Sequence, residues 1–275
     1  MKTKTLYVTD LDGTLLNSDI GINKESLNII NELIENGMMF TYATARSLVS
    51  ATPPTKGLLL KMPVIVHNGA FIVDASEGSI LMAEFFNKEQ VEYVRGRAKK
   101  HGLSPFVYAI MNNKQNVSYV IKDVNPGMQN YINDRAGDDR MNPQSSDGTL
   151  YNGEVYYFTF IGTQEELMDM YLEIKDEPEY IINFAKDIYH DDYWLEIMPK
   201  GATKANAIKK LKQMYGCTKI VCFGDGINDI PMFEIADECY AVENAVLELK
   251  NIATDVVLSN NENGVAIWLK NNFKN

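Results

Sequence analysis

The stretch YVTDLDGTLL, residues 7–16, places two aspartates one residue apart directly after a short apolar run, and a Gly-Thr pair follows them. Successive side chains of a strand point to opposite faces, so Asp10 and Asp12 point the same way if the strand continues through them. Two carboxylates at such a distance repel each other, and one takes up a proton unless a cation lies between them. The stretch therefore predicts a metal ion, a shared proton or solvent at the end of the first strand.

Apolar strand-like runs alternate with amphipathic helical patterns in both terminal parts of the chain. Residues 5–10, 38–44 and 63–69 have the pattern of buried strands, and residues 218–225 repeat it near the C-terminal end. Near-continuous apolar strands separated by helices indicate a parallel sheet that is covered on both faces. We therefore predict an α/β protein with a Rossmann-like parallel-sheet core.

The middle of the chain has a different sequence pattern, with alternating strand-like runs and fewer helices between them. This pattern is typical of an antiparallel α+β domain. We predict an α/β catalytic core formed by residues 1–85 and 191–275, and an inserted α+β cap domain at residues 86–190. The run YWLEIMP, 193–199, is expected to return the chain to the core.

Bulk composition narrows the classes of function. The chain has 275 residues, 45% of them apolar and 23% charged, which is ordinary for a soluble globular protein. Its formal net charge of −11 argues against a nucleic-acid partner, which would need a basic face. The sequence shows no membrane-length apolar stretch, no signal-peptide pattern and no CxxC pair among its three cysteines. We expect a cytoplasmic monomer or small homo-oligomer that contacts neither nucleic acid nor membrane.

Polar motifs follow the predicted strands, at the edge where open parallel sheets bind their ligands. These motifs are DLDGT at 10–14, TAR at 44–46, PKGATK at 199–204 and GDGIND at 224–229. Mg²⁺ prefers oxygen ligands and is commonly held by one or two carboxylates together with phosphate oxygens. The carboxylates of Asp10, Asp12 and Asp225 could supply such a site, which relieves their mutual repulsion.

This set of residues suits phosphoryl transfer. A carboxylate such as Asp10 can attack phosphorus and form an aspartyl-phosphate. The charge that spreads over the transferring phosphoryl group calls for Mg²⁺, an ammonium and a hydroxyl donor, and Lys204 and Thr44 could provide the last two. Asp12 could act as general acid for the leaving group and then as general base for water.

In this order and at strand ends, DLDGTLL, TAR, Lys204 and GDGIND strongly resemble the haloacid dehalogenase superfamily of phosphohydrolases. The HNGA segment at 67–70, together with an insert between the second and third motifs, is similar to the Cof-type branch with a large α/β (type IIB) cap. The resemblance implies that Asp10 is the nucleophile and Asp12 the acid/base. It also implies Mg²⁺ held by Asp10, Asp225 and the main-chain oxygen of Asp12.

The resemblance implies further roles around the phosphate. Asp229 would lie in the outer shell of the metal or position Lys204. The implied substrate- and phosphate-binding residues are Thr44, Ala45, Arg46, Lys204 and Asn228. The second motif departs from the family pattern, because Ala45 stands where relatives usually have glycine.

We therefore predict a Mg²⁺-dependent phosphatase for small phosphorylated metabolites, with sugar phosphates as the preferred class. One alternative is a phosphomutase acting on sugar phosphates, which would return an isomer and release little free phosphate. Another is a non-catalytic, receiver-like phosphoacceptor or metabolite-binding module, which would hold its phosphate without turnover. A dinucleotide-dependent dehydrogenase is disfavoured, because DxDGT follows the first strand where a glycine fingerprint should stand.

Overall fold

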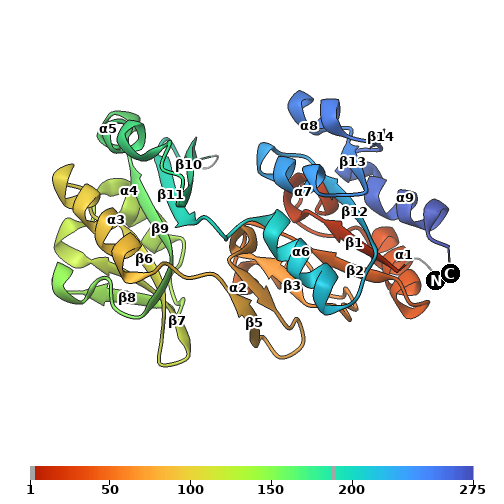
Figure 1. The fold of residues 1–275 in the computed structure, drawn as a ribbon, viewed down its shortest axis with the longest axis horizontal. Helices are drawn as coiled ribbons and strands as arrows, with labels where there is room; N and C mark the ends of the chain where they lie inside the picture. The colour runs from red at the N-terminus through yellow and green to blue at the C-terminus, as the bar shows by residue number, and fades with distance from the viewer. Residues whose placement is uncertain (1–3, 188–189, 275) are drawn as a thin grey trace. The chain divides into compact units, whose positions relative to one another are not determined.

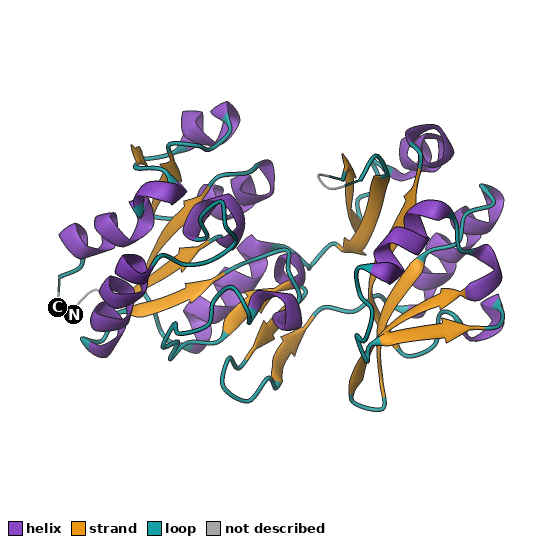
Figure 2. Cartoon of the chain, turned by 180° about the vertical axis from the view of Figure 1, so that it is seen from behind, coloured by secondary structure: helices purple, strands orange, loops and turns teal. Residues whose placement is uncertain are grey.

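The computed structural model describes residues 4–187 and 190–274, and the chain forms two compact units (Figure 1). The first unit combines Met1–Ala83 with Gly201–Asn275, and the second unit is Glu84–Lys200. Both units contain helices as well as strands, as Figure 2 shows. Within the described ranges, no helix is long and apolar enough to cross a membrane.

A parallel sheet forms the centre of the first unit and has the order β14-β13-β12-β1-β2. Its strands are β1 (Thr5–Thr9), β2 (Met39–Tyr42), β12 (Lys219–Gly224), β13 (Glu238–Val242) and β14 (Asp255–Val257). The central strands β1 and β12 come from opposite ends of the chain and pair from Thr5↔Lys219 to Thr9↔Phe223. Their carboxyl ends therefore lie side by side, which brings DLDGT next to GDGIND.

Helices cover both faces of this sheet, as a doubly wound arrangement requires. The helices of the first unit are α1 (Lys24–Glu35), α2 (Leu48–Ala51), α6 (Lys204–Met214), α7 (Ile230–Glu234), α8 (Leu247–Ile252) and α9 (Gly264–Asn272). Phe223 of β12 packs edge-on against Trp268 of α9, and α9 lies beside α1. The side chain of Cys222, one position before Phe223, faces the other side of the sheet. Helix α6 packs beside α7, which also contacts β12. The predicted α/β class is confirmed.

A small antiparallel sheet of β3 (Val64–Val66), β4 (Phe71–Val73) and β5 (Ile80–Ala83) continues the core beyond β2. The two sheets meet through the parallel bridge Ala43↔Ile65. The Thr44 N–H donates to the Ile65 carbonyl at 3.0 Å, so β3 supports the end of β2 that carries the TAR motif.

The second unit contains a mixed, mainly antiparallel sheet with the order β10-β11-β9-β6-β7-β8. Its strands are β6 (Phe106–Met111), β7 (Lys114–Val120), β8 (Met141–Gln144), β9 (Glu154–Gly162), β10 (Tyr180–Lys186) and β11 (Tyr193–Pro199). The helices α3 (Lys88–Lys100), α4 (Pro126–Asn133) and α5 (Gln164–Ile174) accompany them. Apolar side chains of this unit form their own core around Phe158, Phe160 and Leu195.

One expectation about the boundary of the core is wrong. The strand at 193–199, expected to return the chain to the parallel core, pairs antiparallel with both β9 and β10, and the second unit runs on to Lys200 rather than to residue 190. A short apolar run fits a strand of a parallel sheet as well as one of an antiparallel sheet, so the run alone cannot distinguish a parallel neighbour from an antiparallel one. The chain re-enters the first unit at Gly201, directly before α6.

Candidate active site

Asp10 directly follows β1 and is buried, with 5% of its surface exposed. Its N–H donates to the Phe223 carbonyl at 2.9 Å, which extends the β1–β12 pairing by one residue. The burial comes from this position between neighbouring strands. A carboxylate here is held by the sheet and by the side chains around it.

The chain turns sharply after Asp10, so the strand does not continue to Asp12. Asp12 has φ −71° and ψ 124°, and Gly13 has φ 74° and ψ −7°, which are the angles of a type II turn. The third position of such a turn needs a positive φ, which glycine adopts without strain. The expectation that Asp10 and Asp12 share a strand face therefore fails: Asp10 is buried, and the side chain of Asp12 is 53% exposed.

Lys204 lies at the first position of α6, and its side chain is 1% exposed. Its Nζ is 2.5 Å from Asp10 Oδ1 and 2.7 Å from Asp229 Oδ1, so one ammonium joins two buried carboxylates. Burial alone would lower the pKa of Lys204, but the charges of Asp10 and Asp229 outweigh it and raise the pKa. Lys204 is therefore charged at neutral pH.

The GDGIND loop after β12 brings two more carboxylates to the site. Asp229 is fully buried, and its Oδ2 accepts the N–H groups of Asp225 at 2.9 Å and of Gly226 at 3.1 Å. A Cβ on Gly224 would lie 2.7 Å from the same oxygen, so a side chain at that position would displace Asp229. Both oxygens of Asp229 thus have partners within the protein, and this carboxylate orders the loop.

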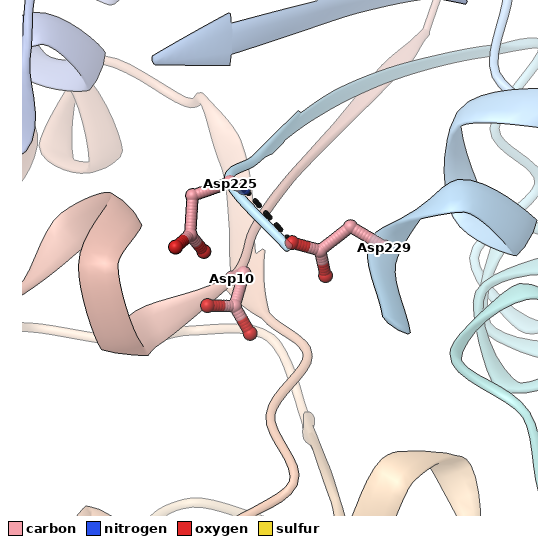
Figure 3. Close-up of side chains that lie close together, drawn as sticks. All are labelled: Asp10, Asp225 and Asp229. Carbon is pink, nitrogen blue, oxygen red and sulfur yellow. Dashed lines mark hydrogen bonds between the residues drawn. The ribbon is translucent and has the colours of Figure 1, made fainter. Parts of the chain in front are cut away.

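Asp10, Asp225 and Asp229 converge, and one oxygen from each lies within 4.8 Å of the others (Figure 3). Burial raises the pKa of Asp10 well above that of an ordinary carboxyl, against the opposing charge of Lys204. Burial, together with the charge of Asp229, raises the pKa of Asp225 to about 6. Three carboxylates share one ammonium, and the excess negative charge calls for a further cation.

The free oxygens of this cluster fit a magnesium ion. Asp10 uses Oδ1 for Lys204, and Asp225 uses Oδ1 for the Thr14 hydroxyl at 3.0 Å, so Oδ2 of each remains for a ligand. A Cβ on Gly13 would lie 2.3 Å from Oδ2 of Asp225, so glycine keeps the space beside that oxygen open. A few carboxylate oxygens with room for water are the surroundings that Mg²⁺ accepts.

The TAR motif lies where β2 ends. Thr44 is fully buried, and its hydroxyl accepts the Arg46 N–H at 3.1 Å, so Thr44 closes the turn that follows. Ala45 is exposed at the tip of this turn. The Asn68 N–H donates to the Thr44 carbonyl at 2.9 Å, which ties the HNGA segment to the TAR motif.

The Arg46 side chain pairs with Asp12. Its Nε donates to Asp12 Oδ2 at 2.7 Å and its Nη2 to Asp12 Oδ1 at 2.5 Å, which is a two-pronged ion pair. A third contact, from Nη1 to the Ser50 carbonyl at 3.1 Å, holds the guanidinium in place. Arg46, a predicted phosphate-binding residue, thus contacts Asp12, the predicted acid/base. Asn228, another predicted phosphate-binding residue, lies exposed on the loop between Asp225 and Asp229.

Two residues of the site were missed from the sequence. Thr14 donates to Asp225, and the Asn244 side chain donates to the Gly13 carbonyl at 2.7 Å. Thr14 stands inside DLDGT, so the motif itself offered a signal for it. Asn244 follows β13 in the segment VENA and carries no local signal, because its role depends on the strand order of the sheet.

The sequence model of the haloacid dehalogenase-like hydrolases matches residues 7–269, which include the whole of this site. The chain belongs to the haloacid dehalogenase-like hydrolase family. The family resemblance drawn from DLDGTLL and GDGIND is therefore confirmed.

Relatives of this haloacid dehalogenase-like hydrolase include named phosphatases. It is 30% identical over 287 residues to 5-amino-6-(5-phospho-D-ribitylamino)uracil phosphatase YwtE of Bacillus subtilis, with 94% of this chain and 95% of YwtE covered. It resembles the solved structure of TM0651 from Thermotoga maritima at 26% identity and a TM-score of 0.78, over 99% and 98% of the two chains. The fold also matches that of BT4131, described as a HAD subclass IIB sugar phosphatase, at 21% identity and a TM-score of 0.73 over 98% of both chains. The predicted enzyme class, a phosphatase-type hydrolase, agrees with these names.

Proposed function

We propose that this chain is a Mg²⁺-dependent phosphatase that hydrolyses small phosphate monoesters through an aspartyl-phosphate on Asp10. The observation that carries the proposal is the buried ion pair of Lys204 with Asp10 and Asp229, beside Asp225 at the carboxyl ends of β1 and β12. Burying so many charges is costly, and such clusters are typical of sites where chemistry needs them.

The reaction has two steps that use the same carboxylates. In the first, an Asp10 oxygen forms a bond to phosphorus while the ester P–O bond breaks, and Asp12 gives its proton to the departing alkoxide. In the second, a water molecule attacks the phosphorus of the aspartyl-phosphate and loses a proton to Asp12. The P–O bond to Asp10 breaks, inorganic phosphate leaves, and both aspartates return to their starting states.

The other residues of the site would balance charge and position the reacting groups. Lys204 lies within 2.5 Å of Asp10 and would balance the negative charge that the phosphoryl group brings. The Thr44 hydroxyl and the N–H groups of the turn after it would donate to phosphate oxygens. Asp10 and Asp225 would hold Mg²⁺, with the Asp12 carbonyl as a further ligand and Asp229 ordering the loop. The ion would supply positive charge against the phosphate oxygens.

We further propose that the substrate is the phosphate ester of a sugar or sugar alcohol, and that the second unit selects it. The acidic cluster and its lysine all lie in the first unit, so the second unit is free to differ in specificity. The name of YwtE supports the substrate class, because that relative acts on a phosphorylated ribityl chain.

Hydrolysis of p-nitrophenyl phosphate, with and without Mg²⁺, tests the proposal directly. We expect release of free phosphate that is abolished by EDTA and restored by added Mg²⁺. Asp10→Asn should lower kcat by roughly 10³-fold or more, because it removes the nucleophile. The matched substitution Asp19→Asn, at an exposed position outside the site, should leave kcat unchanged. Full activity in the Asp10 variant, or an isomer in place of free phosphate from a sugar phosphate, would overturn the proposal.

A further inference from the structure

The segment that follows β13 contacts both acidic loops of the site. The side chain of Asn244 donates from Nδ2 to the Gly13 carbonyl at 2.7 Å. Two residues on, the Val246 N–H donates to the Asp225 carbonyl at 2.9 Å. One short piece of chain therefore connects the turn that carries Asp12 to the loop that carries Asp225.

Asn244 is itself held in a single orientation, although it is exposed. Its Oδ1 accepts the Asn260 N–H at 3.0 Å, so the donor and acceptor ends of the amide both have partners. The side chain of Asn260 continues the chain of contacts and donates to the Leu16 carbonyl at 2.9 Å. The two asparagines thus hold carbonyls on either side of Thr14, in the same turn of chain.

The orientation of one peptide in the held turn decides where the Asp12 carbonyl points. A type II turn differs from a type I turn by rotation of the peptide between its central residues, here Asp12 and Gly13. That rotation would redirect the Asp12 carbonyl and shift the Asp12 side chain. The hydrogen bond from Asn244 holds the peptide that follows Gly13, and it thereby anchors the turn beside the loop that carries Asp225.

We propose that Asn244, supported by Asn260, is a positioning residue that keeps the Asp12–Gly13 turn at a fixed separation from Asp225. The inference rests on the proposed function, since the turn matters because Asp12 acts as acid/base and its carbonyl as a metal ligand. Asn244 touches main chain and no reacting atom, so its effect passes through Asp12. Arg46 holds the Asp12 carboxylate and Asn244 holds the backbone behind it.

The experiment compares Asn244→Ala with Asn261→Ala in the full chain. Asn261 is a matched control, because its side chain also reaches the N-terminal loop, at Ser18, but beyond the turn. Mg²⁺ affinity is measured by calorimetry without substrate, and kcat is measured for p-nitrophenyl phosphate and for glycerol 2-phosphate. Asn244→Ala should weaken Mg²⁺ binding roughly tenfold, as loss of an outer-shell contact does, while Asn261→Ala stays within about twofold of the parent.

The two substrates separate positioning from general damage. Nitrophenolate leaves readily without a proton, whereas the glycerol alkoxide needs one from Asp12. A displaced Asp12 should therefore lower kcat several-fold more for glycerol 2-phosphate than for p-nitrophenyl phosphate. Asn244→Asp keeps the acceptor for Asn260 but cannot donate to Gly13, and it provides the same kinetic comparison if the alanine variant does not fold.

The outcomes are distinct. Equal losses of kcat for both esters with unchanged Mg²⁺ affinity, or equal behaviour of the Asn244 and Asn261 variants, would overturn the positioning role and leave the phosphatase intact. A parent protein that cleaves neither ester with Mg²⁺ present would instead overturn the proposed function.

Discussion

The first unit holds one ammonium between two carboxylates, and the second unit holds one carboxylate among three basic side chains. Lys204 with Asp10 and Asp229 is almost fully enclosed, with side chains 1%, 7% and 0% exposed. Glu173 of α5 contacts the basic end of α3 and is 24% exposed, and its partners are Arg97, Lys100 and His101. The two clusters are opposite in sign and in burial.

The difference separates the cluster that we propose to be catalytic from one that joins two helices. Taking a charge out of water costs several kcal/mol, and the loss of one partner from a buried pair leaves the other uncompensated. Ion pairs at the surface contribute little to the free energy of unfolding, because water and salt screen their charges. We therefore expect the same kind of substitution to have large effects on both stability and activity in the first cluster, and small effects on stability alone in the second.

The largest expected effect comes from replacing the buried lysine. Lys204→Met should lower the free energy of unfolding by about 3 to 5 kcal/mol, because it leaves Asp10 and Asp229 without their ammonium. It should also lower kcat by roughly 10²-fold or more, because the positive charge beside Asp10, the proposed nucleophile, is lost. Urea unfolding and phosphate release measure the two effects.

The surface cluster offers the matched control for this substitution. Lys100→Met removes an ammonium that is 2.8 Å from Glu173, and its side chain is 58% exposed. We expect it to change the free energy of unfolding by less than about 1 kcal/mol and to leave kcat unchanged. Equal destabilisation by the two lysine substitutions would show that burial does not distinguish the clusters.

An intermediate effect is expected from Gly13→Ala. The positive φ of 74° would cost about 1 to 2 kcal/mol for a residue with a Cβ, and that Cβ would also lie 2.3 Å from Asp225 Oδ2. Gly37→Ala is the control, because Gly37 has a φ of 94° but no atom within 4 Å of the added Cβ. Both variants should lose stability, but only the first should lose Mg²⁺ affinity in calorimetry. A parallel loss of affinity in both would contradict the assignment of Asp225 to the metal.

The smallest expected effect concerns Glu173 and its dependence on pH. Hydrogen bonds from Lys100 and then His101 lower the pKa of Glu173 to about 2. A carboxyl whose pKa is lower in the folded state stabilises the fold above its unfolded pKa, and it loses that effect as the pH falls through the folded value. The melting temperature of the parent should therefore exceed that of Glu173→Gln by about a degree or two at pH 7 and low salt, and the gap should shrink between pH 4.5 and pH 2. A difference in melting temperature that persists at pH 2 would show that Glu173 stabilises the fold by packing and not by charge.

The sequence predicted the parts of the site that depend on strand ends alone. Parallel strands place their carboxyl ends at one edge of the sheet, and this brings together Asp10, Lys204, Asp225 and Asp229. The alternation of strands and helices that indicates a parallel sheet is visible in the sequence. The roles assigned to these residues remain predictions. Their gathering at one place is observed.

The parts that could not be predicted depend on turns and on neighbours in space. The backbone angles of Asp12 and Gly13 send Asp12 away from the strand and toward Arg46, which no periodicity reveals. Asn244 reaches Gly13 only because β13 lies next to β12 in the sheet. The apolar run at 193–199 fits either type of sheet, so the sequence alone does not reveal that this strand pairs antiparallel with β9 and β10.

The pairing of β1 with β12 has a consequence for how the protein is made. The partner of residues 5–9, at 219–224, is translated some 200 residues after them, and this delay is on the order of 10 to 40 s. The second unit is continuous in the chain and can complete its own sheet during that delay. The cluster of Asp10, Asp225 and Asp229 can therefore assemble only after the loop at 224–229 has emerged.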